Sequence, residues 1–289
     1  MKRKLLATSD IKNILTQYDI GDYKSRRFIN TTIENQNYKL ITTKGVYLLK
    51  VFDTDDVKSL NVQSNLLEYL EKQTIKVPTL VKNKNKENLS KHKNRYLTIY
   101  TFVQGTHIKR LTAGLCKSMA CEIARLHGSL FRYEFKGTRR IPTYYRQEDL
   151  AMIGYKRLRQ SVIHGDLGKS NILQKEQRVT AIIDFNDAHW DFLIKDLAVM
   201  MPIFLNKTNA KYLPVFLKEY QQYFKLDPTE IKSLPFFTRA HIKGVLEWLA
   251  KQTTDDQTTA QLEHVQKAIR HFTKSLKNII YLRMIDQQE

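Results

Sequence analysis

The stretch Val162-Ile-His-Gly-Asp-Leu-Gly-Lys-Ser-Asn-Ile-Leu173, followed by Ala181-Ile-Ile-Asp-Phe185, decides the fold class of this chain. In each stretch a short apolar strand delivers acidic or amide side chains to its end. Asp166 and Asn171 share one loop, and Asp184 ends the second apolar run. Phosphoryl transfer requires such a set, because one carboxylate takes the proton of an acceptor hydroxyl while two further oxygen donors hold magnesium against nucleotide phosphates.

These motifs resemble the aminoglycoside phosphotransferase and choline kinase superfamily, whose small-molecule kinases share the bilobal protein-kinase-like fold. The resemblance rests on His164-Gly165-Asp166 with Asn171, on Ile183-Asp184-Phe185 and on Asp196-Leu197-Ala198, and it extends over nearly the whole chain. Asn186 departs from the Asp-Phe-Gly motif of protein kinases.

Within that superfamily the chain is most similar to the homoserine kinases of this fold. Three patches carry this finer resemblance: Ile33-Glu-Asn-Gln-Asn-Tyr38 leading into Lys44-Gly45, Asp191-Phe-Leu-Ile-Lys-Asp-Leu-Ala198, and the region from Tyr220 through Leu234-Pro235 to Arg239.

The expected fold is α+β and bilobal. Residues 1–103 should form the nucleotide-binding N-lobe, a five-stranded antiparallel sheet plus a helix, with strands near 23–30, 38–43, 46–52, 77–82 and 96–102. Residues 104–289 should form a mostly helical C-lobe with the catalytic loop, the magnesium site and the acceptor site. Gln104-Gly105 marks the boundary, because the pattern after it becomes helical.

Nucleotide binding is assigned first to Lys50, the one cation in the apolar strand Tyr47-Leu-Leu-Lys-Val-Phe52. It matches the strand lysine that binds the α- and β-phosphates in the family. Gln63 or Glu68 of the following helix could orient it. The turn before Lys50 has no glycine, so phosphate contacts would come from Thr31, Thr32 and Asn35. The resemblance places the nucleotide base against backbone groups around Tyr100 and Phe102.

Catalysis is assigned to Asp166, as the general base or as the group that orients the acceptor hydroxyl. Asn171 and Asp184 should bind magnesium, as the matching family residues do. Lys169 could stabilise the charge of the transferring phosphoryl group, or it could be a solvated loop lysine. His164 should brace the loop by hydrogen bonding, and Asp196 should cap it from the start of a helix.

The acceptor site is the least defined region. Asp191 could pair with a substrate ammonium, and Trp190 could contact an alkyl or quaternary ammonium group or pack in the core. Arg239 could meet a substrate carboxylate or form a surface ion pair.

The formal net charge is +19, which fits a protein that binds nucleic acid, a membrane surface or anionic ligands, or one with a lysine-rich solvated surface. Because the Lys and Arg residues are spread along the chain, we expect the latter and no nucleic-acid partner. No apolar run is long enough to cross a bilayer, and polar residues follow the basic first residues, so a cytoplasmic protein without membrane insertion is expected. The sequence does not indicate an oligomeric state.

The sequence therefore predicts a kinase that uses ATP and Mg²⁺ to phosphorylate a hydroxyl of a small metabolite. An amino alcohol or hydroxy-amino acid is favoured: homoserine first, then choline or ethanolamine, then an aminoglycoside. The alternative is a catalytically silent, kinase-like binding protein.

Overall fold

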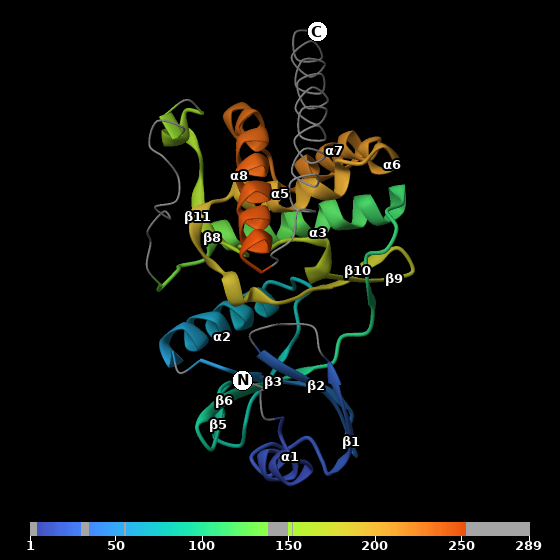
Figure 1. Ribbon diagram of the computed structural model, residues 1–289, viewed down its shortest axis with the longest axis vertical. Coiled ribbons are helices and arrows are strands. Elements are labelled where there is room, and N and C mark those ends of the chain that lie inside the picture. The colour runs from blue at the N-terminus through green and yellow to red at the C-terminus, as the bar shows by residue number, and fades with distance from the viewer. Residues whose placement is uncertain (1–4, 30–34, 55, 138–149, 152, 253–289) are drawn as a thin grey trace. The chain divides into compact units, whose positions relative to one another are not determined.

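The computed structural model describes residues 5–29, 35–54, 56–137, 150–151 and 153–252. The chain divides into two compact units, Met1–Gln104 and Gly105–Glu289. Each unit combines helices with antiparallel strands, which confirms the α+β class (Figure 1).

The N-terminal unit contains one sheet in the order β1-β2-β3-β6-β4, with β5 paired to β6. Its strands are β1 (Tyr23–Ile29), β2 (Asn35–Thr42), β3 (Val46–Phe52), β4 (Leu80–Val81), β5 (Ser90–His92) and β6 (Arg95–Thr101). The five expected strands are present, but the sheet has six, so the predicted number is wrong by one. The extra strand β5 lies in the lysine-rich segment, where Lys93 has a φ of 55° and lets the chain turn back into β6.

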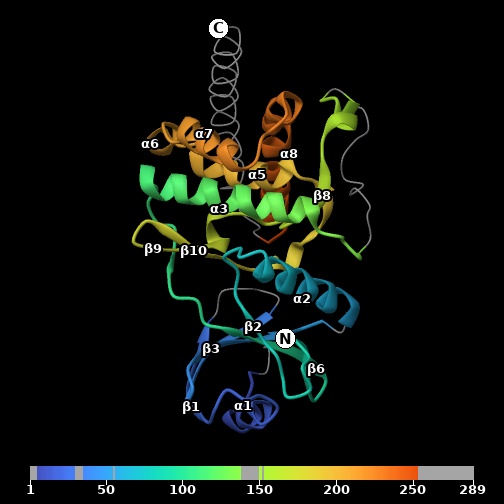
Figure 2. The same cartoon turned by 180° about the vertical axis from the view of Figure 1, so that it is seen from behind.

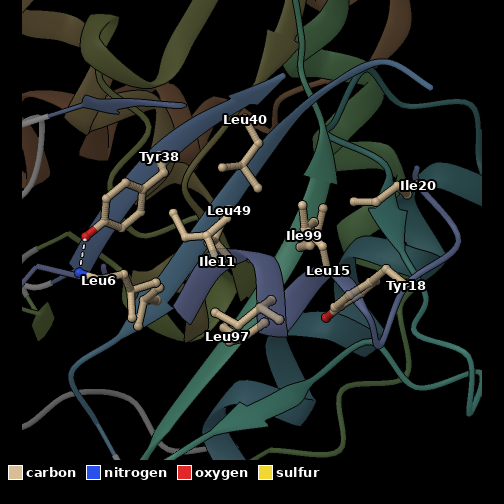
Figure 3. Packing of buried hydrophobic residues seen from close by; sticks show 12 residues of the cluster. Leu6, Ile11, Leu15, Tyr18, Ile20, Tyr38, Leu40, Leu49, Leu97 and Ile99 are labelled. Carbon is tan, nitrogen blue, oxygen red and sulfur yellow. Dashed lines mark hydrogen bonds between the residues drawn. The ribbon is translucent and has the colours of Figure 1, made fainter. Parts of the chain in front are cut away.

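Helix α1 (Thr8–Leu15) packs on one face of this sheet (Figure 3). Its residues Ile11, Ile14 and Leu15 recur at helical spacing and are buried. The sheet meets them with alternate residues of its central strands, because side chains two apart in a strand point to the same face. These residues are Tyr38, Leu40, Leu49, Val51, Leu97 and Ile99. The intervening residues, Lys50 among them, therefore belong to the opposite face.

Helix α2 (Val57–Lys72) follows β3. Asp56 caps its start by accepting a hydrogen bond of 3.1 Å from the backbone N–H of Ser59. Leu60, Leu67 and Leu70 are buried, as their helical spacing predicts.

The C-terminal unit carries its helices around short antiparallel strands (Figure 1 and Figure 2). Strand β8 pairs with β11, and β9 pairs with both β7 and β10. The strands are β7 (Thr106–His107), β8 (Gln160–Ile163), β9 (Ile172–Lys175), β10 (Arg178–Ile182) and β11 (His189–Phe192). The α-helices are α3 (Ala113–Arg132), α5 (Ile194–Met200), α6 (Lys207–Ala210), α7 (Leu213–Tyr223) and α8 (Pro228–Gln252). Short 3₁₀ turns are η1 (Tyr155–Arg157), η2 (Lys169–Asn171), η3 (Phe185–Asp187) and η4 (Met201–Phe204).

In this unit α3 packs against α7, and α5 against α8. The apolar interior includes the rings of Phe192 and Phe237, whose centroids are 5.6 Å apart. Strand β11, which pairs with β8, is thus packed against α8 through Phe192. The ends of these two strands lead into the loops that carry Asp166 and Asp184.

Across the described residues, no helix combines the length and the apolar character that a membrane span requires.

Candidate active site

The loop after β8 brings Asp166 and Asn171 into direct contact. The Asn171 side-chain nitrogen Nδ2 donates to Asp166 twice, to the carboxylate oxygen Oδ2 and to the backbone oxygen, each at 2.8 Å. The loop closes on itself through two further backbone bonds, from the Gly168 N–H to the Asp166 oxygen and from the Asn171 N–H to the Gly168 oxygen. The two side chains that the sequence places five residues apart are therefore fixed side by side.

The buried carboxylate of Asp196, in α5, holds the start of this loop. It accepts hydrogen bonds from the backbone N–H groups of His164 at 2.6 Å and Gly165 at 2.9 Å. The His127 ring lies 3.5 Å from it. Burial opposes the charged form, but His127 and the partners in the loop outweigh it, so the pKa of Asp196 is lowered. This geometry agrees with the expected role of Asp196 as a cap on the loop.

His164 links the catalytic loop to the strand that precedes Asp184. Its Nε2 lies 3.0 Å from the Ile183 backbone oxygen, and its Nδ1 lies 3.3 Å from the N–H of Asp166. Nε2 therefore donates and Nδ1 accepts, which is the neutral tautomer. The ring also contacts buried Phe185, with centroids 4.4 Å apart. His164 thus braces the loop, as expected from the sequence.

Asp184 and Asp187 lie on the turn that follows β10. Asp184 has a φ of 66° and begins η3, which ends at Asp187. Gly165, with a φ of +85°, approaches this turn so closely that an added Cβ would lie 2.1 Å from the Asp187 backbone oxygen. Only glycine fits there, because both the backbone conformation and the space exclude a side chain. The two loops are therefore in backbone contact.

The electrostatic setting of Asp166 is acidic. Burial is the largest cause that raises its pKa, and the neighbouring charges of Asp187 and Asp184 raise it further. The neighbouring His164 ring and the hydrogen bond from Asn171 act to lower this pKa without cancelling the shift. Asp187 was not predicted from the sequence. The sequence offered one indication of it: Asp187 is a second acidic residue only three positions after Asp184. The structure places it at the end of η3.

The donor set around this loop suits magnesium bound together with phosphates. Both hydrogen bonds of the Asn171 side chain use Nδ2, so its oxygen Oδ1 is turned away from Asp166 and can face a cation. Among the described residues no group of three or more His, Cys, Asp or Glu side chains is arranged to hold a metal alone. Magnesium sites of nucleotide enzymes need no such group, because one or two protein ligands, water and phosphate oxygens complete the octahedron.

In the N-terminal unit, Lys50 is buried on the sheet face opposite α1. The register places it opposite Asn37 of β2 and Thr98 of β6. Asn35 lies on the same face as Asn37, two residues away, and both side chains are buried. Asn37 is thus a polar neighbour of Lys50 that sequence reasoning missed. The sequence alone could not identify this neighbour, because the partner of a residue across a sheet depends on the register of the strands and not on spacing along the chain.

Tyr100 shares this face, because β6 alternates in step with Thr98. Phe102 follows β6, and its ring lies 4.4 Å from the Lys39 ammonium. The structure therefore gathers four of the residues assigned to nucleotide binding on one side of the sheet: Lys50, Asn35, Tyr100 and Phe102. Thr31 and Thr32 lie outside the described residues.

The two candidate partners of Lys50 differ in their contacts. Glu68 accepts from Lys82 at 2.8 Å and from Asn88 at 2.8 Å, which lowers its pKa. Its carboxylate therefore already has two partners, Lys82 and Asn88. Gln63 is half-buried on α2, and its role as the partner of Lys50 stays a prediction.

The residues assigned to the acceptor region are more scattered. Trp190 stacks on Phe135, with ring centroids 6.3 Å apart, and its Nε1 donates to Gln160 at 3.3 Å. Arg239 is exposed, and so is Lys169, which was assigned to the transferring phosphoryl group.

Asp191 is fully buried and already has basic neighbours. Its oxygen Oδ2 lies 2.9 Å from the Lys195 ammonium and 3.3 Å from the His189 ring nitrogen Nε2. Oδ1 accepts from the backbone N–H of Phe192 at 2.7 Å. Burial opposes ionisation, but His189 and Lys195 hold the pKa of Asp191 below its ordinary value. A substrate ammonium, the predicted partner of Asp191, would have to compete with both.

Comparison with known proteins identifies the group to which this arrangement belongs. The model of the phosphotransferase enzyme family matches residues 25–234, so the chain belongs to this family. It is a small-molecule kinase that acts on a hydroxyl group.

Similar sequences include two homoserine kinases. That of Bradyrhizobium diazoefficiens is 26% identical over 283 residues, covering 84% of this chain and 86% of the relative. That of Parvibaculum lavamentivorans is 27% identical over 263 residues, covering 80% of this chain and 81% of the relative.

Similar solved structures confirm the kinase-like fold. An amicoumacin kinase in complex with AMP-PNP and Ca²⁺ has a TM-score of 0.72 at 18% identity, covering 91% of this chain and 92% of the other. A microcompartment-associated aminopropanol kinase has a TM-score of 0.69 at 19% identity, covering 93% of this chain and 95% of the other. At such identities the likeness concerns the fold alone.

Proposed function

We propose that this chain transfers the γ-phosphoryl group of ATP, with Mg²⁺, to the side-chain hydroxyl of homoserine or a closely similar hydroxy-amino acid. The observation that carries the proposal is the catalytic loop, in which Asn171 holds the Asp166 carboxylate at 2.8 Å. Its backbone contact with the turn of Asp184 and Asp187 adds the second acidic group. Relatives that are homoserine kinases, matched over more than four fifths of their length, support the choice of acceptor.

Asp166 would accept the proton of the acceptor hydroxyl as that oxygen attacks phosphorus. A raised pKa suits this task, because a base is most effective when its pKa is nearer to the working pH. The hydrogen bond from Asn171 to Oδ2 fixes the carboxylate and leaves Oδ1 to meet the hydroxyl. Asn171 would thus orient the base.

Asn171 and Asp184 would hold magnesium, which on binding neutralises phosphate charge as it develops. Their fit rests on the orientation of the Asn171 amide and on the position of Asp184 at the end of β10. Lys169, exposed on the same loop, would add positive charge to the transferring phosphoryl group.

The N-terminal unit would bind the nucleotide. Lys50 would contact its phosphates with its ammonium, oriented by Gln63, and Asn35 with Thr31 and Thr32 would add polar contacts. Backbone groups at Tyr100 and Phe102 would meet the base. The C-terminal unit, from Gly105 onward, would carry catalysis, magnesium and acceptor binding.

The test is the release of ADP from ATP and Mg²⁺ with homoserine, choline, ethanolamine and kanamycin as acceptors. We expect turnover with homoserine, and its loss when Mg²⁺ is chelated. Turnover only with choline, ethanolamine or kanamycin would reject the hydroxy-amino acid. No turnover, together with ATP binding that does not need Mg²⁺, would indicate a kinase-like binding protein that is catalytically silent.

A further inference from the structure

Three fully buried polar side chains form a continuous path from helix α7 to the catalytic loop. The hydroxyl of Tyr220, in α7, lies 2.7 Å from the ring nitrogen Nδ1 of His127, in α3. The other ring nitrogen, Nε2, lies 3.5 Å from the carboxylate oxygen Oδ2 of Asp196. That carboxylate in turn accepts hydrogen bonds from the two backbone N–H groups that precede Asp166. Tyr220 is thus connected to the start of the catalytic loop through consecutive contacts.

The Tyr220 hydroxyl determines which ring nitrogen of His127 carries the hydrogen. Among the described residues, this hydroxyl has no hydrogen-bond partner other than Nδ1 of the ring. A buried O–H group that makes no hydrogen bond is costly, so the hydroxyl donates to Nδ1. Nε2 is then the nitrogen with the hydrogen. In this form the ring turns an N–H, and not a lone pair, toward the Asp196 carboxylate.

The two sides of the His127 ring are held with different strength. On the Asp196 side the 3.5 Å contact is longer than an ordinary hydrogen bond, and within the described part of the chain Nε2 makes no hydrogen bond. On the other side the hydrogen bond from Tyr220 is short, and the ring of Phe224 packs edge to face at 6.4 Å between centroids. The hydroxyl of Tyr220 is therefore the polar group that fixes the orientation of this ring. Without it, Nδ1 would be buried and unpaired, and we expect the ring to turn away from Asp196.

We propose that Tyr220 is a positioning residue for Asp166 and acts through the ring of His127. The hydroxyl selects and orients the ring form whose N–H faces Asp196. The Asp196 carboxylate then holds the loop in the arrangement that presents Asp166 to the acceptor hydroxyl. Because Tyr220 is fully buried, it touches no reactant and acts only through these neighbours. The inference rests on the proposed function, since the step that it affects is phosphoryl transfer.

The first experiment removes the hydroxyl and keeps the ring. In Tyr220→Phe the aromatic ring can still stack on Phe216, as it does in the unaltered protein. We expect kcat with homoserine to fall about 5- to 50-fold, the effect of losing one partner of a buried hydrogen bond. KM for ATP and for homoserine should stay within about twofold, because the loss concerns the transfer step and not ground-state binding. Rates are measured well below the melting temperature of the variant.

Tyr18→Phe is the matched control, because it makes the same chemical change at a buried hydroxyl of the N-terminal unit. The Tyr18 hydroxyl donates one hydrogen bond, to the Ser90 oxygen Oγ at 2.9 Å, and its ring belongs to the core around α1. This variant should lose a similar amount of stability and keep kcat within about twofold. An equal loss of kcat in both variants, or no loss in Tyr220→Phe, would leave Tyr220 with a structural role alone and overturn the proposal.

A double-mutant cycle tests whether the effect passes through His127. His127→Phe keeps an aromatic ring and removes both nitrogens. In this background Tyr220→Phe should change kcat by less than about twofold, because the hydroxyl has already lost its partner. His127→Gln should recover part of the activity, since its side-chain amide can offer an N–H to Asp196. Additive losses in the double variant would show that Tyr220 acts by another route, against the proposal.

Hydrogen exchange tests the same connection without any turnover, and it needs only Tyr220→Phe and the unaltered protein. The backbone N–H groups of His164 and Gly165 should exchange about 5- to 50-fold faster in the variant, because their acceptor is held less firmly. The N–H of Cys116, bonded within the first turn of α3, should keep its rate. This result supports the positioning role even if the protein transfers no phosphate to homoserine, so the two proposals can fail separately. Unchanged exchange at the loop, or an equal increase at Cys116, overturns the inference.

Discussion

The C-terminal unit contains two aspartates, Asp166 and Asp191, whose ionisable neighbours are acidic in one case and basic in the other. Around Asp166 the neighbouring charges are acidic, from Asp184 and Asp187, and the pKa of Asp166 is raised. Around Asp191 the neighbours are His189 and Lys195, and the pKa of Asp191 is lowered. The ionised form of the same residue type is thus disfavoured in one place and favoured in the other.

The two directions have opposite consequences for stability. A lowered pKa means that Asp191 stabilises the fold at pH values above the ordinary carboxyl value of 3.8, and that this contribution is lost as the pH falls through the lower folded value. A raised pKa means that ionised Asp166 costs stability, which is recovered only when the group is protonated. Asp196 behaves like Asp191. The comparison predicts that removing the charge at Asp166 and removing it at Asp196 will have opposite effects on folding.

The largest expected effect is on catalysis. Asp166→Asn should lower kcat by about 10²- to 10⁴-fold, the usual contribution of a general base. Its melting temperature should stay equal or rise, because a carboxylate in an acidic setting is removed. Steady-state kinetics and thermal unfolding check both halves. Glu176→Gln, at an exposed turn, is the control, and retained activity in Asp166→Asn would remove the base from the mechanism.

The second prediction concerns the contribution of Asp196 to stability. Asp196→Ala should lower the free energy of unfolding by about 3–5 kcal/mol, because it leaves the N–H groups of His164 and Gly165 without their buried acceptor and removes the carboxylate beside His127. Urea denaturation measures this. Asp196→Asn keeps one acceptor oxygen and should cost less. Equal stability of Asp196→Ala and the unaltered protein would contradict the contrast with Asp166.

The contact between the two loops gives a smaller effect. Gly165→Ala should destabilise the protein by about 1–3 kcal/mol, since a Cβ is strained at a φ of +85° and would meet the Asp187 backbone. Gly168→Ala is the matched control in the same loop, because its φ is −93° and its nearest neighbouring atom would lie at 3.5 Å. Urea denaturation of both variants measures the difference. Equal stability would show that the two loops can move apart at little cost in free energy.

The smallest effect sharpens the electrostatic part of the comparison. Asp187→Asn removes a like charge near Asp166, so the pKa of Asp166 should fall and the acid limb of the kcat/KM profile should move to lower pH. Glu176→Gln should leave the limb in place. A limb that stays fixed or moves upward in Asp187→Asn would show that another group sets it.

The catalytic loop was predictable from the sequence because its chemistry is local. Asp166 and Asn171 lie within one turn of chain, and the apolar run before Asp184 marks a strand that must end beside them. The strands of the N-terminal sheet followed from alternation in the same way. The brace by His164 and the cap by Asp196 could be expected once that loop was recognised.

Contacts that depend on packing between elements could not be predicted. Lys195 follows Asp191 by four residues, but β11 ends between them, so no helical spacing announces the pair. Asn37 meets Lys50 only through strand register. The engagement of Glu68 by Lys82 and Asn88 depends on where a loop returns to α2. In each case the residues can be read from the sequence, but which of them are in contact depends on the tertiary structure.

The contact of Gly165 with Asp187 has a consequence for inhibition. In protein kinases the packing of the phenylalanine after the metal-binding aspartate distinguishes active from inactive states. Here Phe185 is buried against His164, and the turn that carries it presses on the catalytic loop through backbone atoms. We therefore expect that a compound which displaces Phe185 would also disturb the loop of Asp166.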